Sequence, residues 1–94
     1  NEYESGEFLT KKDILFGVFF VYNFLKLSIT VDSVDIINFN MIVLQVGDRK
    51  YIFTADRGME AQFEAFKTIY TYMNIEGIEY KSLDMRFEKP IIKI

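Results

Sequence analysis

The sequence predicts an α+β domain in which two helices pack on a mainly antiparallel sheet, in the order α-β-β-β-α-β-β. Two strand-like runs flank a glycine-containing turn near the middle of the chain. Segments with helical apolar spacing precede and follow this pair of runs, and the chain ends in a stretch of alternating polar and apolar residues. Helices on either side of a hairpin, with a returning strand at the end, are typical of this fold class.

Length and composition predict one folded domain. The chain has 94 residues, of which 50% are apolar and 17% aromatic, well outside the composition of disordered segments. A chain of this length buries a single core. We assign residues 1–9 to a lead-in or linker, because they are acidic and lack periodicity, and residues 10–94 to the domain.

Charge and residue usage exclude several classes of function. The net charge of −3 and the scattered basic residues argue against a site for nucleic-acid phosphates. Cysteine and histidine are absent, so the usual zinc sites, Ser-His-Asp triads and Cys-His dyads cannot be built. Asp32 and Asp35 supply too few oxygens for a divalent-ion site, and Asp48, the candidate catalytic acid, is expected to be a solvated turn residue. We expect no metal, no cofactor and no enzymatic activity.

The first helix is expected from about Thr10 to Leu27, with Thr10 as its cap. Its body is apolar nearly all round and too short for the roughly 20 residues of a membrane span, so we expect it to be buried in the core. Phe16 and Phe20 are expected to be left outside the packing. One face of the helix gathers Ile14, Leu15, Val18, Tyr22 and Leu25.

Two short strand segments and a hairpin follow. Ile29 to Val31 and Val34 to Ile36 alternate with polar residues around a bend at Asp32-Ser33. Met41 to Val46 and Lys50 to Ala55 form a hairpin through the intervening Gly-Asp-Arg turn.

The second helix is expected over Met59 to Met73, because its apolar residues recur at steps of three and four. This spacing places a buried stripe on the sheet and leaves an outer polar face. The outer face comprises Glu60, Gln62, Glu64, Lys67 and Thr71.

The last stretch is expected to form a half-buried strand and a terminal strand. Leu83, Met85 and Phe87 fall on one face, and the residues between them fall on the other. Pro90 then favours a sheet margin for the terminal apolar run of residues 91–94. This run is either an open edge that pairs with another strand or a buried last strand without a partner.

The order of elements and one short motif resemble the extracytoplasmic β domain of the bacterial division proteins FtsQ and DivIB. The family's late strand reads aliphatic, Asp, aliphatic, Arg, aromatic. Here those positions are Leu83, Asp84, Met85, Arg86 and Phe87, which follow a helix and precede a terminal strand. The resemblance covers roughly residues 10 to 94. An alternating strand of this kind also allows Asp84 and Arg86 to form an ion pair on one face.

The resemblance implies a non-catalytic scaffold domain of the divisome. It implies partners of the FtsB/DivIC and FtsL types, with the FtsB-type partner docked on the terminal strands. The parent protein would cross the inner (plasma) membrane once, through an anchor outside the present sequence, and would carry a POTRA domain and this domain outside the cytoplasm.

Our leading hypothesis for function is therefore strand addition at the C-terminal edge. The expected partner-binding residues are Arg86, Phe87, Ile91, Ile92, Lys93 and Ile94. The alternative is a small regulatory α+β domain that binds a small ligand between sheet and helices. In that case the aromatic residues Phe16, Phe20, Tyr72 and Tyr80 would line the pocket.

Overall fold

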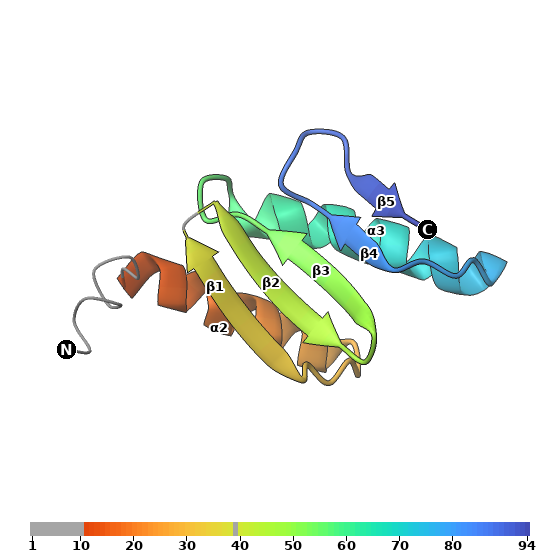
Figure 1. The fold of residues 1–94 in the computed structure, drawn as a ribbon, viewed down its shortest axis with the longest axis horizontal. Helices are drawn as coiled ribbons and strands as arrows, with labels where there is room; N and C mark the ends of the chain where they lie inside the picture. The colour runs from red at the N-terminus through yellow and green to blue at the C-terminus, as the bar shows by residue number, and fades with distance from the viewer. Residues whose placement is uncertain (1–10, 39) are drawn as a thin grey trace.

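The computed structural model describes residues 11–38 and 40–94, and it confirms the α+β fold and the predicted order of elements. The helices are α2 (Lys11–Lys26) and α3 (Met59–Glu76), and the strands are β1 (Ser33–Asn38), β2 (Met41–Val46), β3 (Arg49–Phe53), β4 (Ser82–Asp84) and β5 (Ile91–Lys93). Both helices lie behind one face of the sheet in Figure 1, which leaves the other face open. The predicted lead-in of residues 1–9 and the predicted cap at Thr10 lie outside the described residues.

The five strands form one sheet in the order β1-β2-β3-β4-β5. All neighbouring strands are antiparallel except β3 and β4, which are parallel. A parallel pair needs a crossover connection, and α3 supplies it. The last two strands therefore return beside the hairpin rather than beside β1, a choice that the sequence left open. Of the predicted strand segments, Ile29 to Val31 is not a strand.

The predicted hairpin is confirmed, although Arg49 belongs to β3 and not to the turn, and β3 ends at Phe53 and not at Ala55. Val46 pairs with Arg49 across a two-residue loop whose first residue, Gly47, has φ 61. Glycine at this position suits a type II′ turn, because its backbone takes positive φ without a side-chain clash. The Gly47 N–H donates to the Asp32 carboxylate at 2.7 Å, so the loop before β1 is tied to the hairpin turn.

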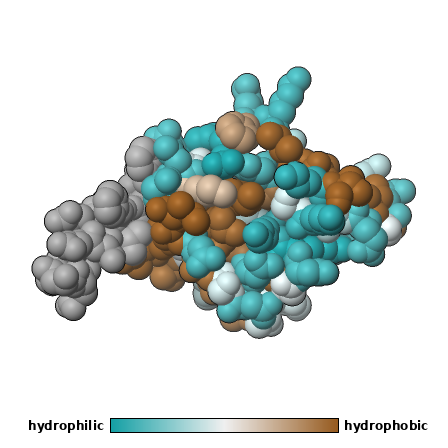
Figure 2. Space-filling view, viewed as in Figure 1, coloured by the Kyte–Doolittle hydropathy of each residue, from teal (hydrophilic) through white to brown (hydrophobic). Residues whose placement is uncertain are grey.

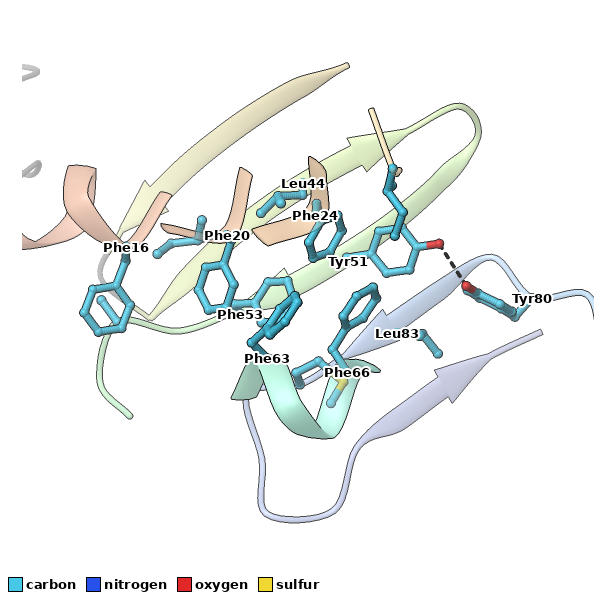
Figure 3. Close-up of a cluster of buried hydrophobic side chains, with 14 of the residues drawn as sticks. Phe16, Phe20, Phe24, Leu44, Tyr51, Phe53, Phe63, Phe66, Tyr80 and Leu83 are labelled. Carbon is cyan, nitrogen blue, oxygen red and sulfur yellow. Dashed lines mark hydrogen bonds between the residues drawn. The ribbon is translucent and has the colours of Figure 1, made fainter. Parts of the chain in front are cut away.

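The core is built from aromatic rings on both helices and the middle strands (Figure 3). Phe20 stacks on Phe53 with ring centroids 4.0 Å apart, and Phe24 stacks on Phe66 at 4.4 Å. The prediction that Phe16 and Phe20 are left outside the packing was wrong, because both are buried. A helix that is apolar all round can face its sheet in several orientations, and the one adopted buries the large aromatic rings.

The outer face predicted for α3 was also wrong at one position. Gln62 is buried and hydrogen-bonds the backbone of the loop that joins β3 to α3. Its amide oxygen accepts from the Thr54 N–H at 2.9 Å, and its amide nitrogen donates to the Thr54 carbonyl at 2.7 Å. The same nitrogen donates to the carbonyl of Arg57 at 3.2 Å. Gln62 is therefore a polar core residue that fixes where α3 begins.

Both helices end in the same backbone motif. Gly77 follows α3 with φ 67, and the Ile78 N–H donates to the Met73 carbonyl. Ser28 follows α2 with φ 64, and the Ile29 N–H donates to the carbonyl of Phe24. These are Schellman ends, in which the residue after the helix adopts the left-handed conformation that favours glycine. Serine at position 28 therefore carries a backbone cost that glycine at position 77 does not.

Candidate partner-binding edge

The candidate site is the β5 edge of the sheet, together with the turn that leads into it. β5 pairs with β4 on one side and is the last strand of the sheet. It lies at the opposite edge from β1 (Figure 1). The backbone groups of β5 that point away from β4 therefore face outward, where an extended segment of another chain can pair with them.

Apolar side chains line this edge and stay exposed. The exposed fractions are 49% for Phe87, 52% for Ile91, 42% for Ile92 and 70% for Ile94. Hydrophobic atoms follow β5 at the upper right of the space-filling view (Figure 2). Of the two interpretations that the sequence left open for residues 91–94, the buried last strand is wrong and the edge strand is correct. The turn residue Phe87 does not continue the buried face of β4, contrary to the predicted alternation.

The register places Ile92 at the end of an apolar row on the helix-covered face. Ile92 pairs with Leu83, which pairs with Tyr51 on β3, and Tyr51 pairs with Leu44 on β2. Leu44, Tyr51 and Leu83 are buried beneath the helices. Ile92 continues this row of the core to the margin of the sheet, where its outer side lacks the next strand.

Lys93 ends a polar row on the open face. It pairs with Ser82, which pairs with Lys50. These three residues and Lys81 line one part of a shallow concavity of about 520 Å³ on the open face of the sheet, and Asp35 of β1 and Asp48 of the hairpin turn line other parts of it. Sequence reasoning missed Lys50 and Lys81, because only the register of three separate strands brings them beside Lys93. The edge therefore combines apolar side chains with a group of lysine ammonium ions.

Arg86 and Asp84 form the ion pair that the alternation of the strand suggested. Arg86 donates from Nε at 2.9 Å and from Nη2 at 2.7 Å to the two carboxylate oxygens of Asp84. The Arg86 backbone N–H also donates to that carboxylate at 3.1 Å. The hydrogen bonds to Asp84 are the main cause that raises the pKa of Arg86, so the guanidinium stays charged.

This ion pair gives Arg86 a structural role in addition to its predicted contact with a partner. Asp84 is mostly buried and ends β4, so the pair anchors the turn that leads to β5. The Arg86 guanidinium also lies 5.2 Å from the centre of the Phe87 ring. Two of the five N–H donors of the guanidinium are used by Asp84, which leaves three that can face a partner carboxylate. The remaining predicted site residues, Phe87 and 91–94, lie together along the edge.

The aromatic residues of the alternative hypothesis do not line one cavity. Phe16 and Phe20, both on α2, pack in the core. Tyr80 is buried beside β3, where its hydroxyl lies 2.8 Å from the Tyr51 hydroxyl (Figure 3). Tyr72 is 56% exposed on α3. Packing therefore separates the residues that were expected to surround a small ligand.

Among the described residues, no group of three or more acidic side chains is placed to hold a metal ion. Within residues 11–38 and 40–94, neither helix is long and apolar enough to cross a membrane. Comparison of the chain with family models, curated proteins and solved structures finds no match.

Proposed function

We propose that this domain is a non-catalytic protein-interaction module that binds an extended segment of a partner by adding it as a strand beside β5. The observation that carries the proposal is an edge strand with three exposed isoleucines along and just after it. Main-chain hydrogen bonds to such an edge supply affinity, and alternate side chains supply specificity.

The rows of the sheet specify the chemistry of the partner segment. A residue that lies opposite Ile92 extends the buried apolar row, so it is apolar. A residue opposite Lys93 lies nearer to Lys93 than to Asp35, which is on β1 at the far edge, so we expect it to be acidic. A residue opposite Ile91 continues a row that contains Val43, Ile52 and Asp84. The partner segment therefore alternates apolar residues on the helix-covered side with at least one carboxylate on the open side.

The resemblance to FtsQ and DivIB is the basis on which we propose a class of partner. We propose that the segment comes from a division protein of the FtsB/DivIC type, assembled with an FtsL-type protein, and that the domain acts as a divisome scaffold. In this proposal the domain lies outside the cytoplasm and belongs to a protein anchored in the inner membrane. The β5 edge supports the mode of binding, and the motif of residues 83–87 supports the family of the partner.

Isothermal titration with the extracytoplasmic segment of an FtsB/DivIC-type protein tests this proposal. The variant Lys93→Glu reverses the charge at the edge and is expected to weaken binding about tenfold or more, because like charges then meet. The matched control is Lys67→Glu, which makes the same charge change on α3, away from the open face. Equal affinities for the two variants would refute the proposed site.

A further inference from the structure

A second surface, distinct from the β5 edge, lies on α2. Its side chains are large, apolar and about half exposed, and we call this surface the α2 face. Its members and their exposed fractions are Ile14 (49%), Leu15 (57%), Val18 (58%), Tyr22 (58%) and Leu25 (60%). A solvent-exposed helix surface ordinarily carries charged side chains, but here no charged residue occurs between positions 14 and 25. The α2 face is the set of residues that the sequence assigned to one side of the helix.

A groove runs beside the α2 face, between α2 and β1. Its volume is about 460 Å³, and its lining is almost entirely apolar. Val21 and Gly17 of α2 and Val34 and Ile36 of β1 form its floor and far wall. Projecting residues of the α2 face, such as Val18, line its near side. A ridge of apolar side chains therefore lies directly alongside an apolar groove.

Gly17 is buried at the bottom of this groove, against β1. A Cβ at this position would lie 3.6 Å from Ile36 Cδ1 and 3.7 Å from Val34 Cγ1, which are ordinary contacts. Its φ is not positive, so the backbone does not require glycine. Glycine within a helix costs about 0.5–1 kcal/mol relative to alanine. The packing of this chain alone would thus accept alanine, but the added methyl group would fill part of the groove between α2 and β1.

We infer that the α2 face binds a second copy of this chain, with the two α2 helices packed against each other about a two-fold axis. A two-fold contact requires a surface that can meet its own image. The α2 face meets this requirement because it has no charge to repel its copy and because its ridge and its groove lie side by side. Each ridge enters the groove of the other copy, as in ordinary helix packing.

The size of the surface predicts a weak dimer. Five half-exposed side chains offer roughly 300 Å² of apolar surface per copy. Homodimer interfaces are about 65% apolar, so two copies would bury roughly 900–1,000 Å² in total. This value lies at the lower limit of about 1,000 Å² for specific interfaces. We therefore expect an equilibrium between monomer and dimer that depends on protein concentration.

This dimer is compatible with strand addition at β5. β1, which forms one wall of the groove, is the edge strand at the opposite end of the sheet from β5. Because β1 and β5 lie at opposite edges of the sheet (Figure 1), β5 of each copy would remain open. Such a dimer presents two equivalent edges, and partners that are themselves paired would bind it with enhanced apparent affinity.

Sedimentation equilibrium of the 94-residue chain tests the inference. The expected mass rises from the monomer value of 11.1 kDa toward twice that value between about 10 μM and 1 mM. Val18→Lys is expected to raise the dissociation constant at least tenfold, because it places a charge in the centre of the contact. The control Ile75→Lys changes an exposed apolar residue on α3, and it should leave the dissociation constant unchanged.

Two further variants separate self-association from a structural effect. Gly17→Ala is expected to raise the midpoint of thermal unfolding, because alanine favours the helix, while it weakens the dimer. Because the chain has no cysteine, Val18→Cys should form a disulfide-linked dimer on mild oxidation, and Ile75→Cys should not.

Three outcomes would overturn the inference. The first is a monomer mass at every concentration. The second is a dimer that survives both Val18→Lys and Gly17→Ala, or one that Lys93→Glu abolishes instead. The third is a wild-type chain that stays monomeric and cosediments with neutral phosphatidylcholine vesicles, whereas the Val18→Lys variant does not. That result would assign the α2 face to a lipid surface. None of these outcomes depends on binding of a division partner. The experiments therefore distinguish an absence of self-association through the α2 face from an absence of partner binding at the β5 edge.

Discussion

The substitution Gln62→Leu is predicted to destabilise the fold strongly, although Leu has a similar volume and is apolar. Gln62 is only 2% exposed, and its amide makes the paired hydrogen bonds with the Thr54 backbone. Thr54 is itself buried, so the variant removes partners of an N–H and a carbonyl in a dry environment. Each such group costs about 1–3 kcal/mol when a partner is lost, and added apolar burial offsets about 1 kcal/mol.

With about 1.5–2 kcal/mol for each of the two groups, less about 1 kcal/mol for apolar burial, the expected net loss is about 2–3 kcal/mol, a large part of the roughly 5–15 kcal/mol by which small domains are stable. For a domain of this size, it corresponds to a fall of about 10–20 °C in the midpoint of thermal unfolding. Urea unfolding followed by circular dichroism measures the loss. The control is Glu64→Leu on the exposed side of α3, which should change stability by less than about 0.5 kcal/mol. A Gln62→Leu variant as stable as this control would refute the reasoning.

The helix ends and the buried tyrosine give three further predictions. Ser28→Gly should raise the free energy of unfolding by about 1 kcal/mol, because glycine removes the cost of φ 64. Gly77→Ala should lower the free energy of unfolding by a similar amount, since φ is 67 at this position. Urea unfolding measures both changes, and changes of the same sign would contradict the proposed role of positive φ at the two helix ends. Burial, followed by the hydrogen bond with Tyr51, raises the pKa of Tyr80 above its usual value. Because the folded state then holds this proton more tightly than the unfolded chain, stability should fall as pH rises above about 10. Tyr80→Phe should make that fall shallower, and an unchanged slope in urea unfolding at several alkaline pH values would contradict the prediction.

The elements whose local patterns agree with their packing were predicted from the sequence. The hairpin has β-rich runs around a glycine that its turn requires, and α3 has a clear apolar stripe. Both were confirmed, with α3 extending three residues beyond the expected end to Glu76. The position of β4 beside β3 was not predicted, because a strand that follows a helix can return to either edge and only the assembled core decides between them.

The orientation of α2 could not be read from its residues. Either side of this helix is apolar enough to be buried, so periodicity alone does not choose between them. The choice depends on which rings meet Phe53 and Phe66 across the core. The buried amide of Gln62 was missed for a related reason: its partners are backbone groups of a loop, which leave no signal in the sequence.

The candidate site was predicted in part. The alternation of residues 82–88 and Pro90 pointed to a sheet margin, and residues 91–94 form or adjoin the edge strand. The ion pair of Asp84 and Arg86 was anticipated from their common face. The contribution of Lys50 and Lys81 was not, because their proximity to Lys93 depends on the register of β3 against β4.

Amide hydrogen exchange of the chain, with and without the FtsB/DivIC-type segment, tests strand addition most directly. If a strand is added beside β5, outward amides within residues 91–94 become hydrogen-bonded and their exchange slows, while β1 amides keep their rates. Binding that leaves the exchange of residues 91–94 unchanged, or that protects α2 and β1 instead, would contradict the proposed role of the β5 edge.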